Sequence, residues 1–189
     1  REDLLEDDFE RLTEQLLQEQ TETFLYRDFQ SRNVMLVDGT PYFIDFQGGR
    51  KGPVYYDVAS FLWQAKANFP NELRDELTQT YIRSLQKWMP VNETAFKEQL
   101  QLFVLFRTLQ VLGAYGFRGY FEKKPHFIQS IPFALNNLRD LLKKGFKEYP
   151  YLHEVLTEMA ELKQFADTRK RTLEVRVFSF AYKKGIPND

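Results

Sequence analysis

The sequence predicts a mainly α fold of the α+β class, in which a series of helices surrounds one β-hairpin. Two observations lead to this prediction. Apolar residues recur at helical spacing over most of the chain, and only residues 34–43 combine two short apolar runs with a turn-forming Asp38-Gly39 pair. The chain has 189 residues, of which 43% are hydrophobic and 16% aromatic, so it can bury one sizeable core.

Six helices are expected, in chain order, over residues 2–20, 57–63, 71–89, 92–112, 133–148 and 151–170. The first is amphipathic and acidic, so its charged side chains are expected to form a solvated outer face. The fourth is apolar almost all round, which indicates a central buried helix, and the glycines after Leu112 are expected to loosen its end. The stripes of the third and sixth helices include Trp88 and Leu162, which we expect in the core.

Asp57 stands at the start of the second helix and is expected to be its N-cap, a role typically worth about 1 kcal/mol. A second role stays open for this carboxylate, which is to hold the loop before the hairpin from behind.

The hairpin determines which polar residues come together. Folding the chain about Asp38-Gly39 pairs residue 37 with residue 40 and residue 34 with residue 43. Asn33 then lies beside Ile44 and Asp45, so an amide oxygen and a carboxylate meet at one place. Asp28 lies on the loop that leads into this place.

These residue types, in this order, match the requirements of phosphoryl transfer. One Asp accepts the proton of the attacking hydroxyl, an Asn five positions later binds Mg²⁺, and a second Asp binds the metal that bridges the ATP phosphates. The protein-kinase signature has the form H-R-D-x-x-x-x-N followed by D-F-G. Here Arg27-Asp28 and Asn33 keep the first spacing and Asp45-Phe46-Gln47 follows, while Tyr26 replaces the His. The simpler alternative is an Asp-rich loop and turn that bind nothing.

Candidate acceptor-binding residues lie on the helices expected beside the loop. Arg107, Tyr115 and Arg118 at the end of the long helix, with Tyr56 and Trp63 near Asp57, combine aromatic faces with charged groups, as sugar sites do. The alternative is that these aromatic residues are simply core. Between residues 97 and 149, nine Lys or Arg face four Asp or Glu, which argues against a polycationic acceptor.

Composition excludes several other functions. The net charge is −1, so no charge imbalance points to nucleic acid or to a membrane surface. The chain has no Cys and two His, which makes disulfides impossible and a zinc site or a catalytic triad unexpected. The longest apolar stretch is too short to span a bilayer. We therefore expect a cytoplasmic protein whose partners are small molecules.

Three segments carry a family resemblance. Residues 26–33, 44–47 and 52–57 resemble the aminoglycoside phosphotransferase superfamily, and within it the sugar kinases that phosphorylate N-acetylmuramate and N-acetylglucosamine in bacterial cell-wall recycling. The resemblance covers residues 3–150. It implies a protein-kinase-like C-terminal lobe, ATP and Mg²⁺ as cofactors, and transfer of the γ-phosphate to a sugar hydroxyl.

The resemblance also implies residue roles. Asp28 would be the catalytic base, Asn33 and Asp45 the metal ligands, and Arg27, Arg32 and Asp57 supporting residues. Two alternatives stay open: a catalytically inactive adaptor that binds nucleotide or sugar, and a kinase for another hydroxyl, such as an aminoglycoside or choline.

The chain departs from the superfamily at both ends. No Gly-rich loop and no lysine-bearing strand precede Asp28, so we expect the N-terminal lobe to be missing and this chain alone to be inactive, with activity in a full-length parent. The kinase-like lobe is expected over residues 1–170. Residues 172–180 alternate with period two, and the last residues resemble the opening of the C-terminal domain of RapZ-type adaptor proteins. Residues 171–189 are thus expected to be the first strand of a truncated second domain.

Overall fold

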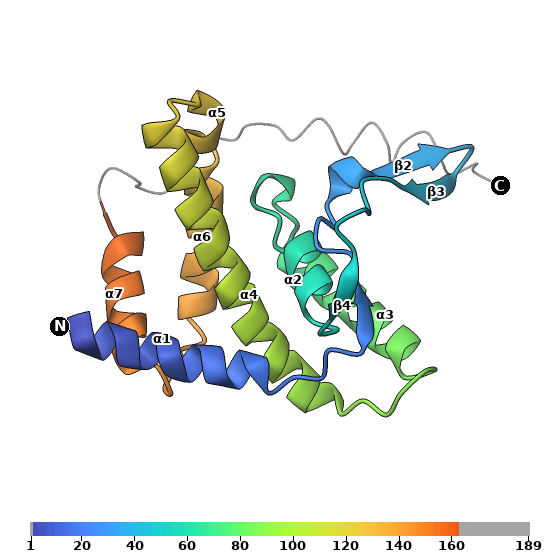
Figure 1. The fold of residues 1–189 in the computed structure, drawn as a ribbon, viewed down its shortest axis with the longest axis horizontal. Helices are drawn as coiled ribbons and strands as arrows, with labels where there is room; N and C mark the ends of the chain where they lie inside the picture. Colours follow the sequence, from blue (N-terminus) through green and yellow to red (C-terminus); the bar gives the residue numbers. More distant parts are fainter. Residues whose placement is uncertain (1, 163–189) are drawn as a thin grey trace.

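The computed structural model describes residues 2–162 and is mostly helical, which confirms the mainly α prediction (Figure 1). Its helices are α1 (Glu2–Leu17), α2 (Tyr56–Leu62), α3 (Asn71–Leu85), α4 (Glu93–Gly116), α5 (Pro125–Ile128), α6 (Ile131–Leu142) and α7 (Pro150–Ala160). Its strands are β1 (Thr23–Leu25), β2 (Val34–Val37), β3 (Thr40–Phe43) and β4 (Arg50–Gly52). Short 3₁₀ turns, η1 (Ser31–Asn33) and η2 (Ala65–Ala67), and a π-helical turn, η3 (Phe117–Phe121), complete the described part.

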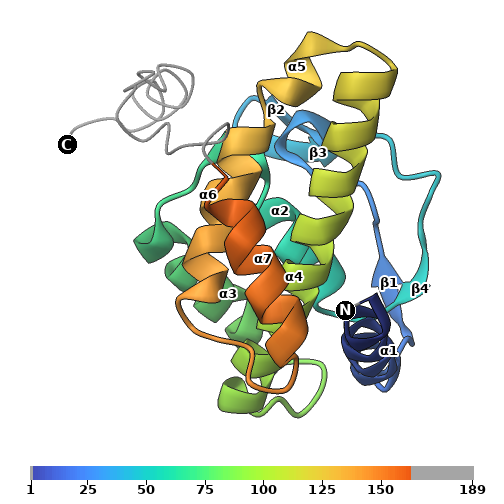
Figure 2. The same ribbon diagram turned by 90° about the vertical axis from the view of Figure 1, so that its left-hand side faces the viewer.

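The part of α4 from Phe96 to Thr108 lies in the core, as its apolar sequence predicts, whereas the rest of the helix is only partly buried or exposed. The helix runs diagonally through the molecule with α6 and α7 on one side and α2 on the other (Figure 1). Figure 2 shows α1 nearly end-on beside α4 and α7. Val104 and Leu105 of α4 and Leu138 of α6 are completely buried where these helices meet.

By length and composition alone, residues Glu93–Phe121 would also suit a membrane span. The core helix of a water-soluble protein has the same properties. Here α1, α2 and α6 all pack against α4, which is the arrangement of a core helix.

Helix α1 is attached to α7 through one buried carboxylate. Asp8 is 1% exposed, pairs with Arg11, and accepts a hydrogen bond of 2.7 Å from the backbone N–H of Leu152 in the first turn of α7. The residue before α7, Tyr149, makes no side-chain cap of its own. Asp8 thus caps α7 from another helix. The prediction that the acidic residues of the first helix are all solvated was therefore wrong for Asp8.

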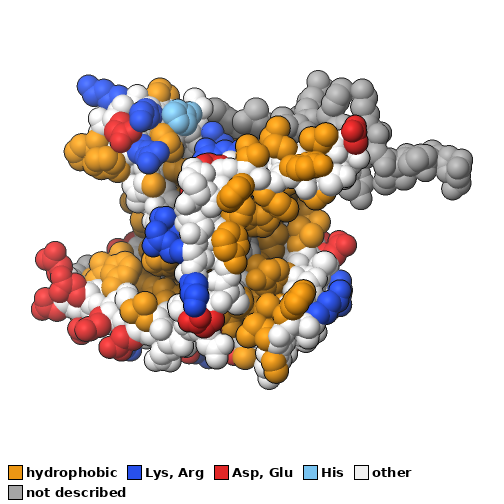
Figure 3. Space-filling model, turned by 45° about the vertical axis from the view of Figure 1, so that its right-hand side comes forward, with side chains coloured by type: hydrophobic (Ala, Val, Ile, Leu, Met, Phe, Trp, Pro, Cys, Tyr) orange, Lys and Arg blue, Asp and Glu red, His pale blue; other side chains and the backbone are white. Residues whose placement is uncertain are grey.

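The hairpin β2–β3 has the predicted register. Val34 pairs with Phe43 and Val37 with Thr40, and the N–H of Ile44 donates to the carbonyl of Asn33 at 3.0 Å. The outer residues of the hairpin form an apolar surface (Figure 3), because Met35, Leu36, Val37, Tyr42 and Phe43 are each about half or more exposed.

A second pair of strands was not predicted. β1 and β4 pair antiparallel, with Thr23 opposite Gly52 and Leu25 opposite Arg50. A Cβ on Gly52 would lie 2.6 Å from a methyl carbon of Leu25, so this pairing requires glycine at position 52. The pair draws the chain before Tyr26 and the chain after Asp45 together at the base of the hairpin.

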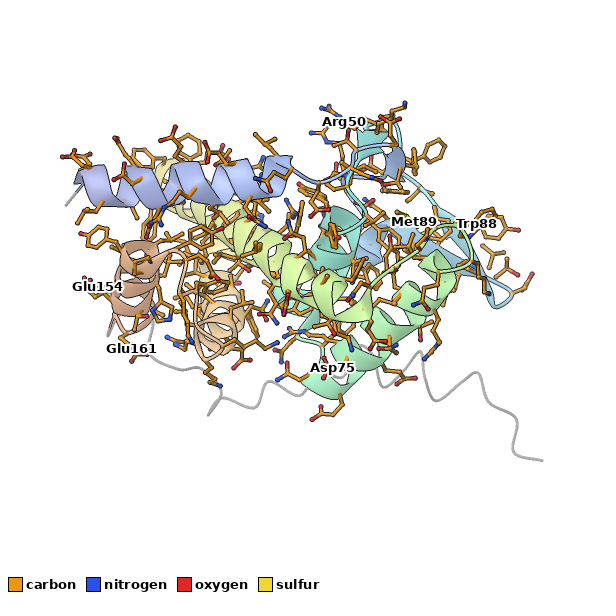
Figure 4. The ribbon with its side chains drawn as sticks, turned by 90° about the horizontal axis from the view of Figure 1, so that it is seen from below. Arg50, Asp75, Trp88, Met89, Glu154 and Glu161 are labelled. Atoms are coloured by element: carbon orange, nitrogen blue, oxygen red, sulfur yellow. The ribbon has the colours of Figure 1, made fainter. Side chains whose placement is uncertain are left out.

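Several helix ends differ from the predictions. α3 ends at Leu85, which leaves Trp88 beyond the helix, pointing outward and 87% exposed (Figure 4). α4 continues past Leu112 to Gly116 and into η3, so the glycines do not loosen it. Leu162 is 45% exposed because α7 ends at Ala160. α4 is capped by the residue at which its helix was expected to begin, since the side chain of Asn92 accepts from the N–H of Ala95 at 3.0 Å.

The predicted strand at 172–180 and the predicted second domain over residues 171–189 lie outside the described residues.

Candidate active site

The loop that contains Asp28 is held from behind by Asp57. One carboxylate oxygen of Asp57 accepts from the backbone N–H of Tyr26 at 2.6 Å, and the other accepts from the N–H of Arg27 at 3.0 Å. Arg27 has a φ of 74°, in the left-handed region that non-glycine residues adopt at a cost. Asp57 therefore fixes the strained entry to the loop. It does not cap α2, which begins at Tyr56 without a side-chain cap, so the second of its two expected roles is the one observed.

Asn33 closes the loop at its other end. This side chain is 5% exposed within η1, and its amide nitrogen donates to the carbonyl of Asp28 at 2.8 Å. The backbone N–H and the hydroxyl of Ser31 both lie 3.1 Å from the side-chain oxygen of Gln64, which attaches the loop to the segment after α2. Because the Asn33 nitrogen is used inside the loop, its amide oxygen is the atom left for a ligand.

Tyr26 connects the loop to the segment after the hairpin. Its hydroxyl donates to the carbonyl of Ile44, next to Asp45. Burial raises the pKa of the Tyr26 phenol, and the negative charges of Asp45, Asp28 and Asp57 raise it further. All three carboxylates therefore lie close enough to act on one buried ring.

Phe29 secures the middle of the loop. Its ring stacks on that of Phe61 in α2 at 4.8 Å between centroids, and lies 5.5 Å from Tyr26 and 6.0 Å from Phe43 of the hairpin. Aromatic pairs in this range contribute about 0.5–1.5 kcal/mol each beyond their buried area. The loop is thus packed against both α2 and the hairpin.

The donor atoms fit Mg²⁺. Asn33 offers an amide oxygen and Asp45 offers a carboxylate, and Mg²⁺ prefers such hard oxygen ligands. The Oδ1 atom of Asp45 accepts a hydrogen bond of 2.6 Å from the side chain of Gln47. No group of three or more His, Asp or Glu side chains able to hold a metal occurs in residues 2–162. A metal held by this pair would therefore take its other ligands from phosphate oxygens and water, as Mg²⁺ does in kinases.

A cavity of about 370 Å³ opens beside the loop. Its walls come from the loop, from α2 and η2, from the second half of α4, and from α5 and α6. Figure 3 shows basic side chains gathered at the end of the molecule that carries α5, whereas acidic side chains gather on α1. The lining includes Gln30, Arg32, Ser60, Trp63, Lys66, Arg107, Tyr115, Arg118, His126, Phe127 and Asn137.

The three predicted acceptor residues, Arg107, Tyr115 and Arg118, all line this cavity, together with Trp63. Arg32, which was expected to be a supporting residue, lines it too. Tyr56 does not line the cavity, but its hydroxyl accepts a hydrogen bond from Arg107. Asp28, Asn33 and Asp45 lie outside the lining, although their loop neighbours Gln30 and Arg32 form one wall.

Arg107 is held rigidly by neutral partners. One terminal nitrogen donates to the hydroxyl of Tyr56 and to the side-chain oxygen of Gln110, both at 2.8 Å, and the other to the hydroxyl of Ser60 at 3.1 Å. The guanidinium also lies 4.8 Å above the ring of Tyr56. Burial raises the pKa of Tyr115, while the charges of Arg107 and Arg32 lower it, so both arginines act on this phenol at the cavity wall.

Sequence reasoning missed the network behind Trp63. Arg74 of α3 is 4% exposed, donates to the carbonyl of Leu62 at 3.1 Å and to Asn137 at 2.7 Å, and lies 5.3 Å from the Trp63 ring. The amide nitrogen of Asn137 donates in turn to the carbonyl of Trp63 at 2.9 Å. No sequence pattern marks Asn137, but an Arg within the apolar stripe of a helix, as at position 74, indicates a buried partner.

Comparisons with known proteins give a family match and several similar proteins. Residues 1–92 match the model of the phosphotransferase enzyme family (APH). The chain is 31% identical over 144 residues to a protein of Neisseria meningitidis named N-acetylmuramate/N-acetylglucosamine kinase, a match that covers 74% of this chain and 42% of the relative.

Two proteins of the same name, from Pseudomonas aeruginosa and Pseudomonas putida, are 27% and 24% identical over 153 and 151 residues. These matches cover 79% and 78% of this chain, and 44% and 40% of the relatives. The chain thus spans less than half the length of the curated relatives that it matches. These matches and the signature residues on the loop and hairpin indicate a phosphotransferase-family domain in residues 1–92.

Proposed function

We propose that this chain supplies the catalytic loop and the acceptor pocket of an ATP-dependent kinase that phosphorylates a hydroxyl group of a sugar. The observation that supports the proposal best is the arrangement of loop and hairpin. Asn33 is bound to the backbone of Asp28 within the loop, and Asp57 holds that loop in place. Gln30 and Arg32 of the same loop line a cavity of small-molecule size.

Asp28 is the proposed general base. Its carboxylate takes the proton of the acceptor hydroxyl as that oxygen forms a bond to the γ-phosphorus of ATP. The bond from this phosphorus to the β–γ bridging oxygen breaks, and ADP is the leaving group. Mg²⁺ held by Asn33 and Asp45 would neutralise charge on the transferring phosphates. Arg27 and Asp57 are the proposed supporting residues, since they fix the backbone on which Asp28 stands.

An amino sugar is the proposed acceptor because the relatives are named for N-acetylmuramate and N-acetylglucosamine. Trp63, Tyr115 and Phe127 supply aromatic surfaces against which a sugar ring can pack. Aminoglycosides and choline are cations, and the basic lining of the cavity disfavours them. A role in cell-wall recycling and a place in the cytoplasm, where ATP is present, follow from the amino-sugar proposal.

The test is ADP formation by the full-length protein that contains this chain, with Mg²⁺-ATP and one acceptor at a time: N-acetylmuramate, N-acetylglucosamine, kanamycin or choline. We expect ADP formation with the amino sugars and little with the cations. Sugar-dependent binding without any ADP formation would favour the inactive adaptor instead.

Two variants test the roles within the loop and hairpin. Asp28→Asn is expected to lower kcat by about 10²–10⁴-fold without unfolding the protein, because it removes a base and no core contact. Asp45→Ala is expected to abolish the use of Mg²⁺-ATP. The matched control is Asp38→Asn at the exposed hairpin turn, where φ is 50° and Asn is readily accommodated. If the first two variants turn over ATP as fast as the control, the proposed mechanism is wrong.

A further inference from the structure

Gln64 connects the loop of Asp28 to the proposed acceptor pocket. It lies in the segment between α2 and η2 and is half-buried. Its side-chain oxygen accepts two hydrogen bonds of 3.1 Å, one from the backbone N–H and one from the hydroxyl of Ser31. Gln64 also lines the cavity, together with Gln30 and Arg32 on either side of Ser31. One side chain thus binds the loop and borders the cavity.

The bonds to Ser31 determine how the amide of Gln64 is oriented. A backbone N–H can only donate, so the atom that faces it must be the amide oxygen and cannot be the nitrogen. A carbonyl oxygen has two lone pairs, and Ser31 uses both of them. The amide nitrogen takes no part in these bonds and has no hydrogen-bond partner among residues 2–162. It is therefore a hydrogen-bond donor of fixed orientation on a residue of the cavity wall.

The backbone before Gln64 is held from the interior of the molecule. The buried guanidinium of Arg74 donates to the carbonyl of Leu62 at 3.1 Å, and the side chain of Asn137 donates to the carbonyl of Trp63 at 2.9 Å. Arg74 and Asn137 are bonded to each other at 2.7 Å, and both are buried. Buried hydrogen-bond networks of this kind rigidify the segment that they bind. Gln64 therefore follows a rigid piece of backbone.

We propose that Gln64 is both an acceptor-binding and a positioning residue. Its amide nitrogen donates a hydrogen bond to an oxygen atom of the bound sugar, either a hydroxyl or an acyl carbonyl. Its amide oxygen holds Ser31 and with it the loop of Asp28. One planar group thus positions both the sugar and the loop, so the acceptor hydroxyl and the proposed base keep a defined relative position. This inference rests on the proposed sugar-kinase function and adds to it a residue that aligns the two reactants.

Two substitutions at position 64 separate the two contacts. Gln64→Glu keeps an oxygen that can accept from Ser31 but has no amide nitrogen. Gln64→Met has nearly the same shape and neither polar atom. The probe is N-acetylglucosamine with the full-length protein that contains this chain, because the charge added by Gln64→Glu has no charge on this sugar to repel. The control is Gln129→Glu, which adds the same charge at an exposed position outside the cavity lining.

Calorimetric titration measures the contact with the sugar. We expect the Kd of N-acetylglucosamine to rise about three- to tenfold in Gln64→Glu, as for the loss of one hydrogen bond between neutral groups, and the rise to persist at high salt. A purely structural role of Gln64 predicts no rise, because this variant can still bind Ser31. The inference is overturned if Gln64→Glu binds the sugar as tightly as the control does, or if the wild-type protein does not bind it.

Amide hydrogen exchange measures the contact with the loop. We expect the Ser31 amide to stay protected in Gln64→Glu and to exchange about tenfold faster in Gln64→Met. Where ADP is formed, Gln64→Met should lower kcat about 10- to 100-fold because the loop loses its position, whereas Gln64→Glu should mainly raise the KM of the sugar. Unchanged protection of Ser31 in Gln64→Met would overturn the positioning role.

Failure of this inference is distinguishable from failure of the proposed function. Neither the affinity for the sugar nor the exchange of the Ser31 amide needs phosphate transfer, so both can be measured whether or not ADP is formed. An active kinase in which Gln64→Glu behaves as the control would refute only the role of Gln64. A protein that binds the sugar through Gln64 and forms no ADP would refute only the kinase.

Discussion

The attachment of the proposed catalytic loop to Asp57 yields a direct prediction. In Asp57→Ala, the backbone N–H groups of Tyr26 and Arg27 lose their acceptor, and Arg27 loses the contact that favours its φ of 74°. We expect the loop to relax, the chain to lose stability, and the amides of Tyr26 and Arg27 to exchange faster with solvent.

The size of the effect follows from the two hydrogen bonds. A hydrogen bond to a charged group contributes about 1.5–3 kcal/mol. The bond to Tyr26 is short and partly buried, while that to Arg27 is exposed and counts for less. Burial is the main cause of the raised pKa of Asp57, so removing this carboxylate also removes an unfavourable charge. We expect the free energy of unfolding to fall by about 2 kcal/mol, which a domain of this size tolerates.

Urea unfolding and amide hydrogen exchange measure the two consequences. The matched control is Asp75→Ala on α3, whose exposed carboxylate points away from the molecule (Figure 4). The reasoning is refuted if the unfolding midpoint shifts no more than in the control, or if both amides keep their protection. Either result would show that the bond from Asn33 to Asp28 holds the loop without Asp57.

Two further predictions concern other parts of the fold. Asp8→Ala should destabilise the chain by about 1–2 kcal/mol, because the first turn of α7 loses its cap. Urea unfolding measures this loss, with the exposed-site variant Glu10→Ala as the control. Tyr55 and Tyr81 should ionise late in a titration followed by tyrosinate absorbance, because burial raises the pKa of each to about 12. Since the folded chain holds these protons more tightly than the unfolded chain, their contribution to stability is complete below about pH 10 and is lost as the pH rises toward 12.

The parts of the site that sequence predicted well depend on local geometry. The register of the hairpin follows from Asp38-Gly39 and the alternation around it, so the position of Asn33 beside Ile44 follows from the turn and a count of residues. Spacing alone also predicts that Asp28, Asn33 and Asp45 group together, and a hydrogen bond from Asn33 to the carbonyl of Asp28 joins two of them.

The missed features all join segments that are distant in sequence. Asp8 caps a helix 144 residues away, and Arg74 binds Asn137 across 63 residues. The pairing of β1 with β4 depends on three-residue strands that carry almost no periodic signal. Composition shows that an acid or an arginine is present, but only the packed structure shows which distant backbone group it satisfies.

Helix α2 connects the loop of the proposed base to the proposed acceptor pocket through one of its faces. Asp57, Ser60 and Trp63 follow one another at a spacing of three residues, so they lie along the same side of the helix and its C-cap. The first binds the loop of Asp28, the second binds Arg107, and the third forms the cavity wall that Arg74 and Asn137 brace. Because α2 and its C-cap carry all three contacts, a small rotation of α2 would move the proposed base and Arg107 together.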